Sequence, residues 1–242
     1  TGVVSKIKAI RAAINQASHP ALLMVDTISS LASLDYRHDE WGVDVTVAGS
    51  QKGLMLPPGL SFNAVSARAL QASKQSTLPN AYWNWDDILM SNKEGQFPYT
   101  PSTNLLYGLQ TALDMLLEEG LENVFSRHLR LAEAARCAVR AWGLEILCQN
   151  ADRYSNSLTA VLVPDGHDAD QLRKIILENF NMSLGNGLGR LSGKVFRIGH
   201  LGDFNELSLI GTLGGVEMGL KLAQIPHKSG GAQAAIDFLA VN

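Results

Sequence analysis

The stretch LLMVDTISSLASLDYRHDEWGVDVTVAGSQKGLMLPPGLSF, residues 22–62, decides the fold of this chain. Apolar and β-branched runs within and beside it are bounded by turn residues, which is the pattern of buried strands. The first run stops at Asp26, and the last is entered through the turn Pro57-Pro58-Gly59. We therefore expect three strands, at residues 21–25, 43–48 and 60–65.

A helix is expected immediately before this stretch. Residues 3–17 place Val4, Ile7, Ile10 and Ile14 three or four positions apart, so one face of an amphipathic helix is apolar. A helix followed closely by an apolar strand is typical of a doubly wound α/β sheet. The helix is predicted to be under way at the first residue, as expected of a processed chain or of the C-terminal part of a longer one.

The chain after residue 66 changes character twice. We expect a short helix at 67–74, an irregular active-site or interface segment at 76–99, and helix from 103 to about 142 interrupted at Gly120. Beyond Gly143 short strands alternate with helices, which predicts a compact α+β unit with an antiparallel sheet. Its strands are expected at 144–147, 158–163 and 195–198, and its helices at 168–179 and 205–223.

Composition excludes several classes of protein. Of the 242 residues 46% are hydrophobic, and 20 Lys and Arg against 23 Asp and Glu give a net charge of −3. Without a basic block, binding to nucleic acid or to an acidic membrane is not expected. No apolar run approaches the roughly 20 residues of a membrane span. Two cysteines are too few for a disulfide framework or a metal site, so no metal is predicted.

Two charged residues follow neighbouring predicted strands. Asp26 ends the first strand, and Lys52 comes just after the second in the run Ser50-Gln51-Lys52-Gly53. Ligands of open α/β sheets bind outside the carboxyl ends of the strands, so both side chains are expected at one crevice. An acid and a lysine there suit a Schiff-base lysine with a carboxylate for a pyridinium nitrogen. A capping aspartate and a solvated loop lysine are the alternative interpretation.

The quoted stretch resembles the class V pyridoxal-phosphate aminotransferases, and within them the serine–glyoxylate and alanine–glyoxylate aminotransferases. The elements VDTISS, GSQK and PPG occur in the family's order, and YTPSTNLLYGLQTALDML, EEGLENVFSRH and KVFRIGHLGD match further on. The resemblance implies an α/β fold of the pyridoxal-phosphate transferase type, which is similar to aspartate aminotransferase. Residues 1–100 would be the C-terminal part of a large cofactor-binding domain with a mixed, mostly parallel sheet. Residues 101–120 would be a connecting helix, and 121–242 a small C-terminal α+β domain.

The resemblance also implies residue roles. Lys52 would bind the aldehyde of pyridoxal 5'-phosphate, and Asp26 would hold its pyridine nitrogen protonated. Ile28 would pack on the ring and Gln51 would contact the phosphate. Thr100 would reach the phosphate of the partner subunit, which requires a homodimer.

In the same way, Arg197 would bind the α-carboxylate of the substrate with two parallel hydrogen bonds. A structural salt bridge is the alternative for this residue. The reaction implied is transamination between serine or alanine and glyoxylate, which gives glycine and a 2-oxo acid. Two alternative hypotheses stay open: the chain catalyses another class V reaction, or it is a non-catalytic fragment of such an enzyme. Family members are longer at the N-terminus and carry a glycine-rich phosphate-binding backbone there.

Three further features stay open. The run Gly185-Asn186-Gly187-Leu188-Gly189 does not have its third glycine at the position that a dinucleotide fingerprint requires, and it is expected to be a flexible loop before the Arg197 strand. His200 would either line the substrate site or be a hydrogen-bonded loop histidine. The cluster Tyr82-Trp83-Asn84-Trp85 is expected to pack at an interface rather than to form the site entrance. The C-terminal residues Leu239-Ala240-Val241-Asn242 carry no SKL-type peroxisomal signal, which favours the cytoplasm.

Overall fold

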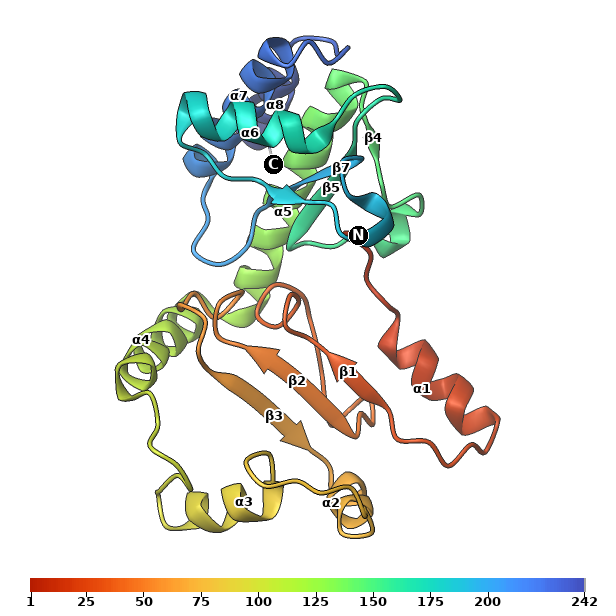
Figure 1. Ribbon diagram of the computed structural model, residues 1–242, viewed down its shortest axis with the longest axis vertical. Helices are drawn as coiled ribbons and strands as arrows, with labels where there is room; N and C mark the ends of the chain where they lie inside the picture. Colours follow the sequence, from red (N-terminus) through yellow and green to blue (C-terminus); the bar gives the residue numbers. More distant parts are fainter. Residues whose placement is uncertain (242) are drawn as a thin grey trace. The chain divides into compact units, whose positions relative to one another are not determined.

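The computed structural model describes residues 1–241, and these form two compact units (Figure 1). The first, called here the N-terminal unit, comprises Lys6–Leu31 and Tyr36–Met115. The second, called the C-terminal unit, comprises Thr1–Ser5, Ala32–Asp35 and the chain from Leu116 onward. The assignment of residues 1–100, 101–120 and 121–242 to a cofactor domain, a connecting helix and a small domain stays a prediction.

A three-stranded sheet forms the centre of the N-terminal unit. Its strand order is β1-β2-β3, with β1 parallel to β2 and β2 antiparallel to β3. The sheet is mixed, as predicted, and in this chain one of its two pairings is parallel. Its elements are α1 (Ile7–Gln16), β1 (Met24–Asp26), β2 (Val45–Gly49), β3 (Ser61–Val65), α2 (Ala67–Ser73), α3 (Trp85–Lys93) and most of α4 (Thr103–Glu119).

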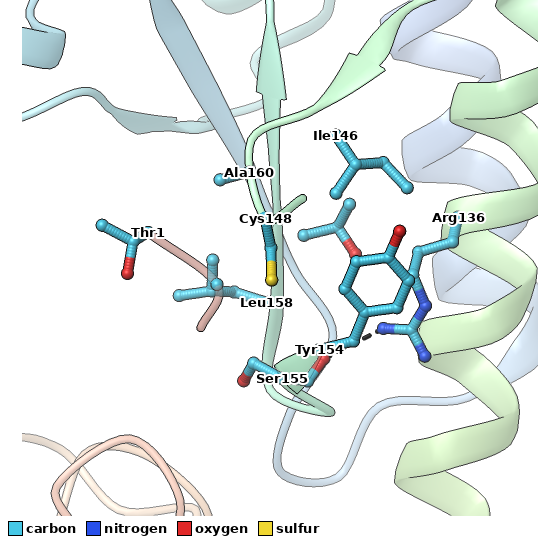
Figure 2. Close-up of a pocket in the computed structure, with 10 residues that line it drawn as sticks. Thr1, Arg136, Ile146, Cys148, Tyr154, Ser155, Leu158 and Ala160 are labelled. Carbon is cyan, nitrogen blue, oxygen red and sulfur yellow. Dashed lines mark hydrogen bonds between the residues drawn. The ribbon is translucent and has the colours of Figure 1, made fainter. Parts of the chain in front are cut away.

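The first helix begins later than the sequence predicts. Helix α1 starts at Ile7 and not at residue 3, because Val3 forms an antiparallel bridge with Tyr154 within the C-terminal unit, to which residues 1–5 belong. The Val4 amide donates to the Arg153 carbonyl over 2.8 Å, and the Gly2 carbonyl accepts from the Ser155 amide over 3.0 Å. Figure 2 shows Thr1 among the residues that line one depression of this unit. The apolar spacing predicted the helix correctly, but it could not show these long-range hydrogen bonds.

The segment expected to be irregular contains a helix. Helix α3 lies within residues 76–99, where apolar periodicity is weak. The residues at its two ends favour the helix instead. The Asn84 side chain accepts a hydrogen bond from the Asp86 amide over 3.0 Å and so caps the N-terminus. Acidic residues occupy the first turn and Lys93 lies in the last turn, where each charge suits the helix dipole. The prediction of irregular structure is therefore wrong for Trp85–Lys93, because capping rather than an apolar stripe defines this helix.

The C-terminal unit contains the predicted antiparallel sheet. Its order is β4-β5-β7-β6, and all three pairings are antiparallel. Gly120 separates α4 from α5 with a φ of 83°, and Gly143 ends α5 with a φ of 74°, so both predicted breaks are confirmed. The elements are α5 (Leu121–Trp142), β4 (Glu145–Ile146), β5 (Leu158–Leu162), α6 (Ala169–Phe180), β6 (Gly185–Asn186), β7 (Val195–Gly199), α7 (Glu206–Leu222) and α8 (Gly231–Val241), with two 3₁₀ turns at Ala151–Arg153 and Gly189–Leu191.

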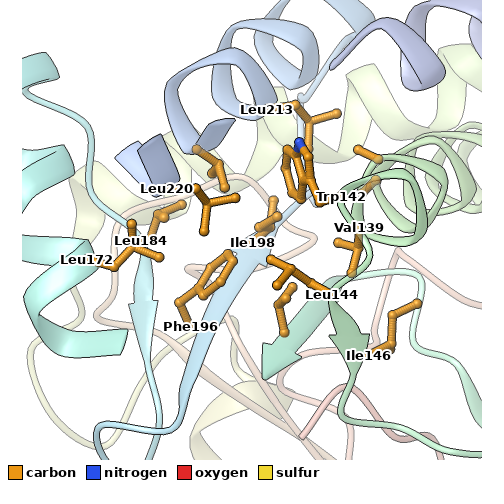
Figure 3. Close-up of a cluster of buried hydrophobic side chains, with 14 of the residues drawn as sticks. Val139, Trp142, Leu144, Ile146, Leu172, Leu184, Phe196, Ile198, Leu213 and Leu220 are labelled. Carbon is orange, nitrogen blue, oxygen red and sulfur yellow. The ribbon is translucent and has the colours of Figure 1, made fainter. Parts of the chain in front are cut away.

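One hydrophobic core joins this sheet to its helices. Phe196 and Ile198 of β7 are fully buried and extend from the sheet toward the helices (Figure 3). Trp142 of α5 lies in the same cluster, and its Nε1–H donates to the Glu217 carboxylate over 3.0 Å. Glu217 also accepts from the Gly230 and Ala232 amides, so it caps the start of α8. Helix α8 has no counterpart in the sequence prediction.

The glycine run 185–189 is not simply a loop. Gly185 and Asn186 form strand β6, which pairs with Arg197 and Phe196 of β7, and a 3₁₀ turn follows at Gly189–Leu191. A side chain at Gly187 would meet the Leu191 carbonyl oxygen at 1.9 Å, so the backbone folds closely on itself there. The expectation of a loop is therefore wrong for Gly185 and Asn186, which form a strand, and close backbone approach requires glycine at position 187.

Candidate active site

Asp26 occupies the position that the strand pattern predicts. It is the last residue of β1, and it lies opposite Val47 of the parallel strand β2. Its carboxylate is exposed, and Oδ1 accepts a hydrogen bond from the Ile28 amide over 2.8 Å. The next residue, Thr27, is buried and donates through both its amide and its hydroxyl to the Val47 carbonyl. The end of β1 is thereby fixed to β2 while the Asp26 carboxylate stays free to bind.

The loop that carries Lys52 is organised by a buried serine. The Ser50 hydroxyl donates to the Pro57 carbonyl over 2.7 Å and accepts from the Leu60 amide over 3.1 Å. Its backbone amide donates to the Leu60 carbonyl, and its carbonyl accepts from the Leu56 amide. Ser50 is fully buried, so these contacts are shielded from water. Ser50 belongs to the GSQK element, but its organising role could not be predicted, since burial of a serine is not visible in sequence.

Lys52 differs from every other lysine in the described chain. It is half-buried, whereas the eight others are exposed. Within residues 1–241 its Nζ forms neither a hydrogen bond nor an ion pair. A partly buried amine without a partner is available for covalent chemistry.

The other predicted cofactor residues also lie in the N-terminal unit. Ile28 is half-buried just beyond β1, and Gln51 is exposed beside Lys52. Thr100 is exposed on the segment between α3 and α4. The roles assigned to these three residues stay predictions. In the tyrosine and tryptophan cluster, Tyr82 stacks on Tyr99 with ring centroids 4.8 Å apart, and Trp83 is 82% exposed.

Arg197 lies in the middle of β7, in the C-terminal unit. It is paired in register with Ala160 of β5 and Gly185 of β6. Its side chain is half-buried, and its Nε is buried without a hydrogen-bond partner among residues 1–241. No carboxylate of the described chain forms an ion pair with it. The alternative of a structural salt bridge therefore has no support in this structure, and a buried guanidinium nitrogen without a partner calls for an anion.

His200 is a buried, hydrogen-bonded histidine. Its Nδ1 donates to the Asn156 carbonyl over 2.9 Å, and its Nε2 lies 3.0 Å from the Thr159 hydroxyl, which donates to it. Burial lowers the pKa of His200 to about 4, against the opposing effect of the Asn156 hydrogen bond. The neutral ring therefore links β5 to the segment after β7, which fits the second of the two interpretations left open for it.

The depression in Figure 2 is a packing seam of the C-terminal unit. It is lined by Thr1, Tyr154 and Cys148 among others, and it has no room even for one water molecule. Arg136, which also lines it, donates to the Ser155 carbonyl over 3.0 Å and lies over the Tyr154 ring. Across residues 1–241 no group of three or more His, Cys, Asp or Glu could hold a metal ion. No helix in that part of the chain is both long and apolar enough to cross a membrane.

The fold and these residues together define an α/β protein of the aminotransferase type. Among solved structures, pyridoxamine–pyruvate aminotransferase from Mesorhizobium loti is similar, with a TM-score of 0.91 and 32% identity over 99% of this chain and 62% of its own. The family model for class V aminotransferases matches residues 1–195. The chain belongs to the class V aminotransferase family.

The curated relatives of this chain include two glyoxylate aminotransferases. Serine–glyoxylate aminotransferase of Arabidopsis thaliana is 50% identical over 236 residues, which cover 97% of this chain and 59% of that protein. L-aspartate–glyoxylate aminotransferase of Paracoccus denitrificans is 44% identical, over 97% of this chain and 59% of its own length. The chain thus spans about three-fifths of the length of the curated relatives it matches.

Proposed function

We propose that this chain is part of a pyridoxal-phosphate enzyme that transfers the amino group of a small amino acid to glyoxylate. With serine as donor the products are hydroxypyruvate and glycine; with alanine they are pyruvate and glycine. The observation that carries the proposal is the parallel pairing of β1 and β2. It brings Asp26 and the Lys52 loop to the carboxyl ends of neighbouring strands, where α/β sheets bind ligands.

The residues present fit the reactive end of this cofactor. Lys52 offers an amine without a partner for the aldehyde, and Asp26 offers an exposed carboxylate for the ring nitrogen. Ile28 would pack against the ring, and Gln51 would donate to the phosphate. When bound, pyridoxal phosphate supplies an electron sink for the carbon atom that loses a proton.

The chain's own residues then supply the proton transfers and the binding. Lys52 Nζ, as the neutral amine, would take the proton from the substrate Cα and pass it to the cofactor carbon atom that receives the amino group. Asp26 would accept a hydrogen bond from the ring nitrogen and favour its protonated form. Arg197 holds the substrate carboxylate through two parallel N–H donors. The unpartnered Nε of Arg197 supports this role.

The choice of amino donor rests on the relatives. The names of the similar proteins from Arabidopsis thaliana and Paracoccus denitrificans differ in the donor, serine in one and L-aspartate in the other, and share glyoxylate. The higher identity to the first favours serine. Another class V reaction and a non-catalytic fragment are the competing outcomes. A cytoplasmic location also stays a prediction.

Borohydride reduction of the chain mixed with pyridoxal phosphate tests the proposal. We expect one equivalent of label per chain, located on Lys52 by peptide mass mapping, because only this lysine is half-buried and without a partner in the described residues. Label scattered over the exposed lysines, or no label, would contradict a cofactor site in this chain. Assays with serine, alanine and L-aspartate against glyoxylate then rank the donors.

A homodimer is part of the same proposal, since Thr100 would bind the phosphate held by the partner subunit. Large apolar side chains of the N-terminal unit support a partner, because Leu78, Trp83, Met90 and Tyr107 are each more than two-thirds exposed. Sedimentation velocity is expected to give twice the chain mass, and Trp83→Asp to shift the population toward monomer. A parent chain that stays monomeric at every concentration would overturn the dimer.

A further inference from the structure

Small residues flank Arg197 on both sides in the sheet. Phe196 and Ile198 extend into the core, so Arg197 lies on the opposite face of β7, because side chains alternate along a strand. On that face its cross-strand neighbours are Ala160 of β5 and Gly185 of β6. On this face of the sheet, the Arg197 side chain therefore lies between the methyl group of Ala160 and the hydrogen atom of Gly185.

Gly185 leaves space that the Arg197 side chain occupies. A Cβ placed on Gly185 would lie 3.0 Å from Nε of Arg197, 3.1 Å from its Cβ and 3.4 Å from Cζ. The first two separations are well below the 3.5–4.0 Å of ordinary contacts between such atoms. Any side chain at position 185 must therefore displace the arginine or the strand.

Strand β6 is held in place, so the arginine would have to move. Just before the strand, Nε of Arg173 on α6 donates to the Leu184 carbonyl over 2.8 Å. Just before β7, the Gly193 amide donates to the Asp170 carboxylate over 3.1 Å, and Asp170 also accepts from Arg173. Helix α6 thus fixes both ends of the segment 184–193.

We propose that Gly185 is a positioning residue for the carboxylate-binding site of Arg197. It allows the guanidinium to lie close along the sheet face with its Nε buried and unpaired, aimed at the carboxylate of an amino acid or a 2-oxo acid. The inference rests on the proposed function of Arg197 and adds the residue that sets where the guanidinium lies.

Phenylglyoxal labelling of the whole chain tests this inference. Adduct formation at Arg197 is measured by peptide mass mapping over a pyruvate titration. In the parent chain pyruvate is expected to protect Arg197. In Gly185→Ala the pyruvate concentration for half-protection should rise about tenfold, because displacement of a binding group by a fraction of an ångström is costly. Gly199→Ala is the matched control: Gly199 lies on the same strand and face as Arg197, and apart from its chain neighbours no atom of the described residues is within 4 Å of the added methyl.

Each outcome separates the inference from the proposed function. A half-protection concentration that rises in Gly185→Ala and stays at the parent value in Gly199→Ala supports the positioning role. Equal protection in all three chains overturns it and leaves the role of Arg197 intact. No protection in the parent overturns both. Buried Arg136 must stay unreactive, which reports an intact fold.

A measurement on the parent chain does not depend on the folding of a variant. In a pyruvate titration followed by NMR, the Gly185 amide and the Arg197 Nε–H are expected to shift with the same half-saturation. A response of Arg197 without one from Gly185 would overturn the inference.

Discussion

Replacing Lys52 with alanine is expected to abolish the covalent attachment of pyridoxal phosphate to this chain. The reaction needs a primary amine at a fixed point, and Lys52 supplies it from a loop that Ser50 organises through four hydrogen bonds, two of them to Leu60 just before β3. The eight remaining lysines are exposed, so none is held in a comparable place. Labelling after borohydride reduction should fall from one equivalent to background.

Two variants make this result specific. Lys52→Arg keeps the positive charge but cannot form a carbon–nitrogen double bond with the aldehyde, so it should also lose the label. Lys8→Ala removes an exposed lysine from α1 and should keep it. Persistent label in Lys52→Ala, or its loss in Lys8→Ala, would contradict the assignment of Lys52.

Replacing Asp44 with alanine is expected to destabilise the N-terminal unit by about 3–5 kcal/mol, the usual effect of breaking a buried ion pair. Asp44 is 5% exposed and accepts hydrogen bonds from Arg11 at 2.7 Å, from Arg68 at 2.8 and 2.9 Å, and from the Leu23 amide at 2.8 Å. Without the carboxylate the Arg11 guanidinium, largely buried, and the Leu23 amide lose a partner. Arg68 is half exposed and can be rehydrated.

Amide hydrogen exchange measures this effect locally. Protection of the Thr27 amide, bonded to Val47 across β1 and β2, should fall in Asp44→Ala, while β5 and β7 of the C-terminal unit keep theirs. The matched control is Glu40→Ala, which breaks only an exposed ion pair with Arg37 and should cost between 0 and about 1 kcal/mol. If Asp44→Ala lowered the free energy of unfolding as little as Glu40→Ala, the contacts of Asp44 would not stabilise the N-terminal unit in this way.

The buried contacts of Asp44 also make the stability of the folded chain depend on pH. Burial alone would raise the pKa of Asp44, but the hydrogen bonds and charge of Arg68 and the Leu23 amide outweigh it and lower the pKa. The folded chain therefore binds this proton less readily than the unfolded chain. The stabilisation is fully present above about pH 4, the ordinary range of aspartate, and is lost as the pH falls through the lowered pKa.

Much of the site could be predicted because it follows from local pattern. Apolar runs that end at Asp26 and just before Lys52 predict strands, and parallel pairing then brings their carboxyl ends together. The GSQK and VDTISS elements carried the family resemblance that the family model bears out. The helix breaks at Gly120 and Gly143 could also be predicted, since glycine readily adopts the positive φ that both positions have.

Contacts between residues that lie far apart in the sequence could not be predicted from it. Val4 has the spacing of a helical residue, yet its amide bonds to Arg153, which lies 149 positions away, and the helix begins only at Ile7. Helix α3 is defined by its caps, and α8 by a carboxylate of α7 that caps it from outside. Each of these depends on a partner that the local sequence does not contain.

Local apolar periodicity, turn residues and short motifs were enough to predict the family, the strands of the N-terminal unit and the candidate residues Asp26, Lys52 and Arg197. Three features appear only in the folded chain: Ser50 organises the Lys52 loop, Arg197 lacks a carboxylate partner among the described residues, and Gly185 makes room for the Arg197 side chain. Burial, pairing and steric room are properties of residues brought together across the chain, so they exist only after folding.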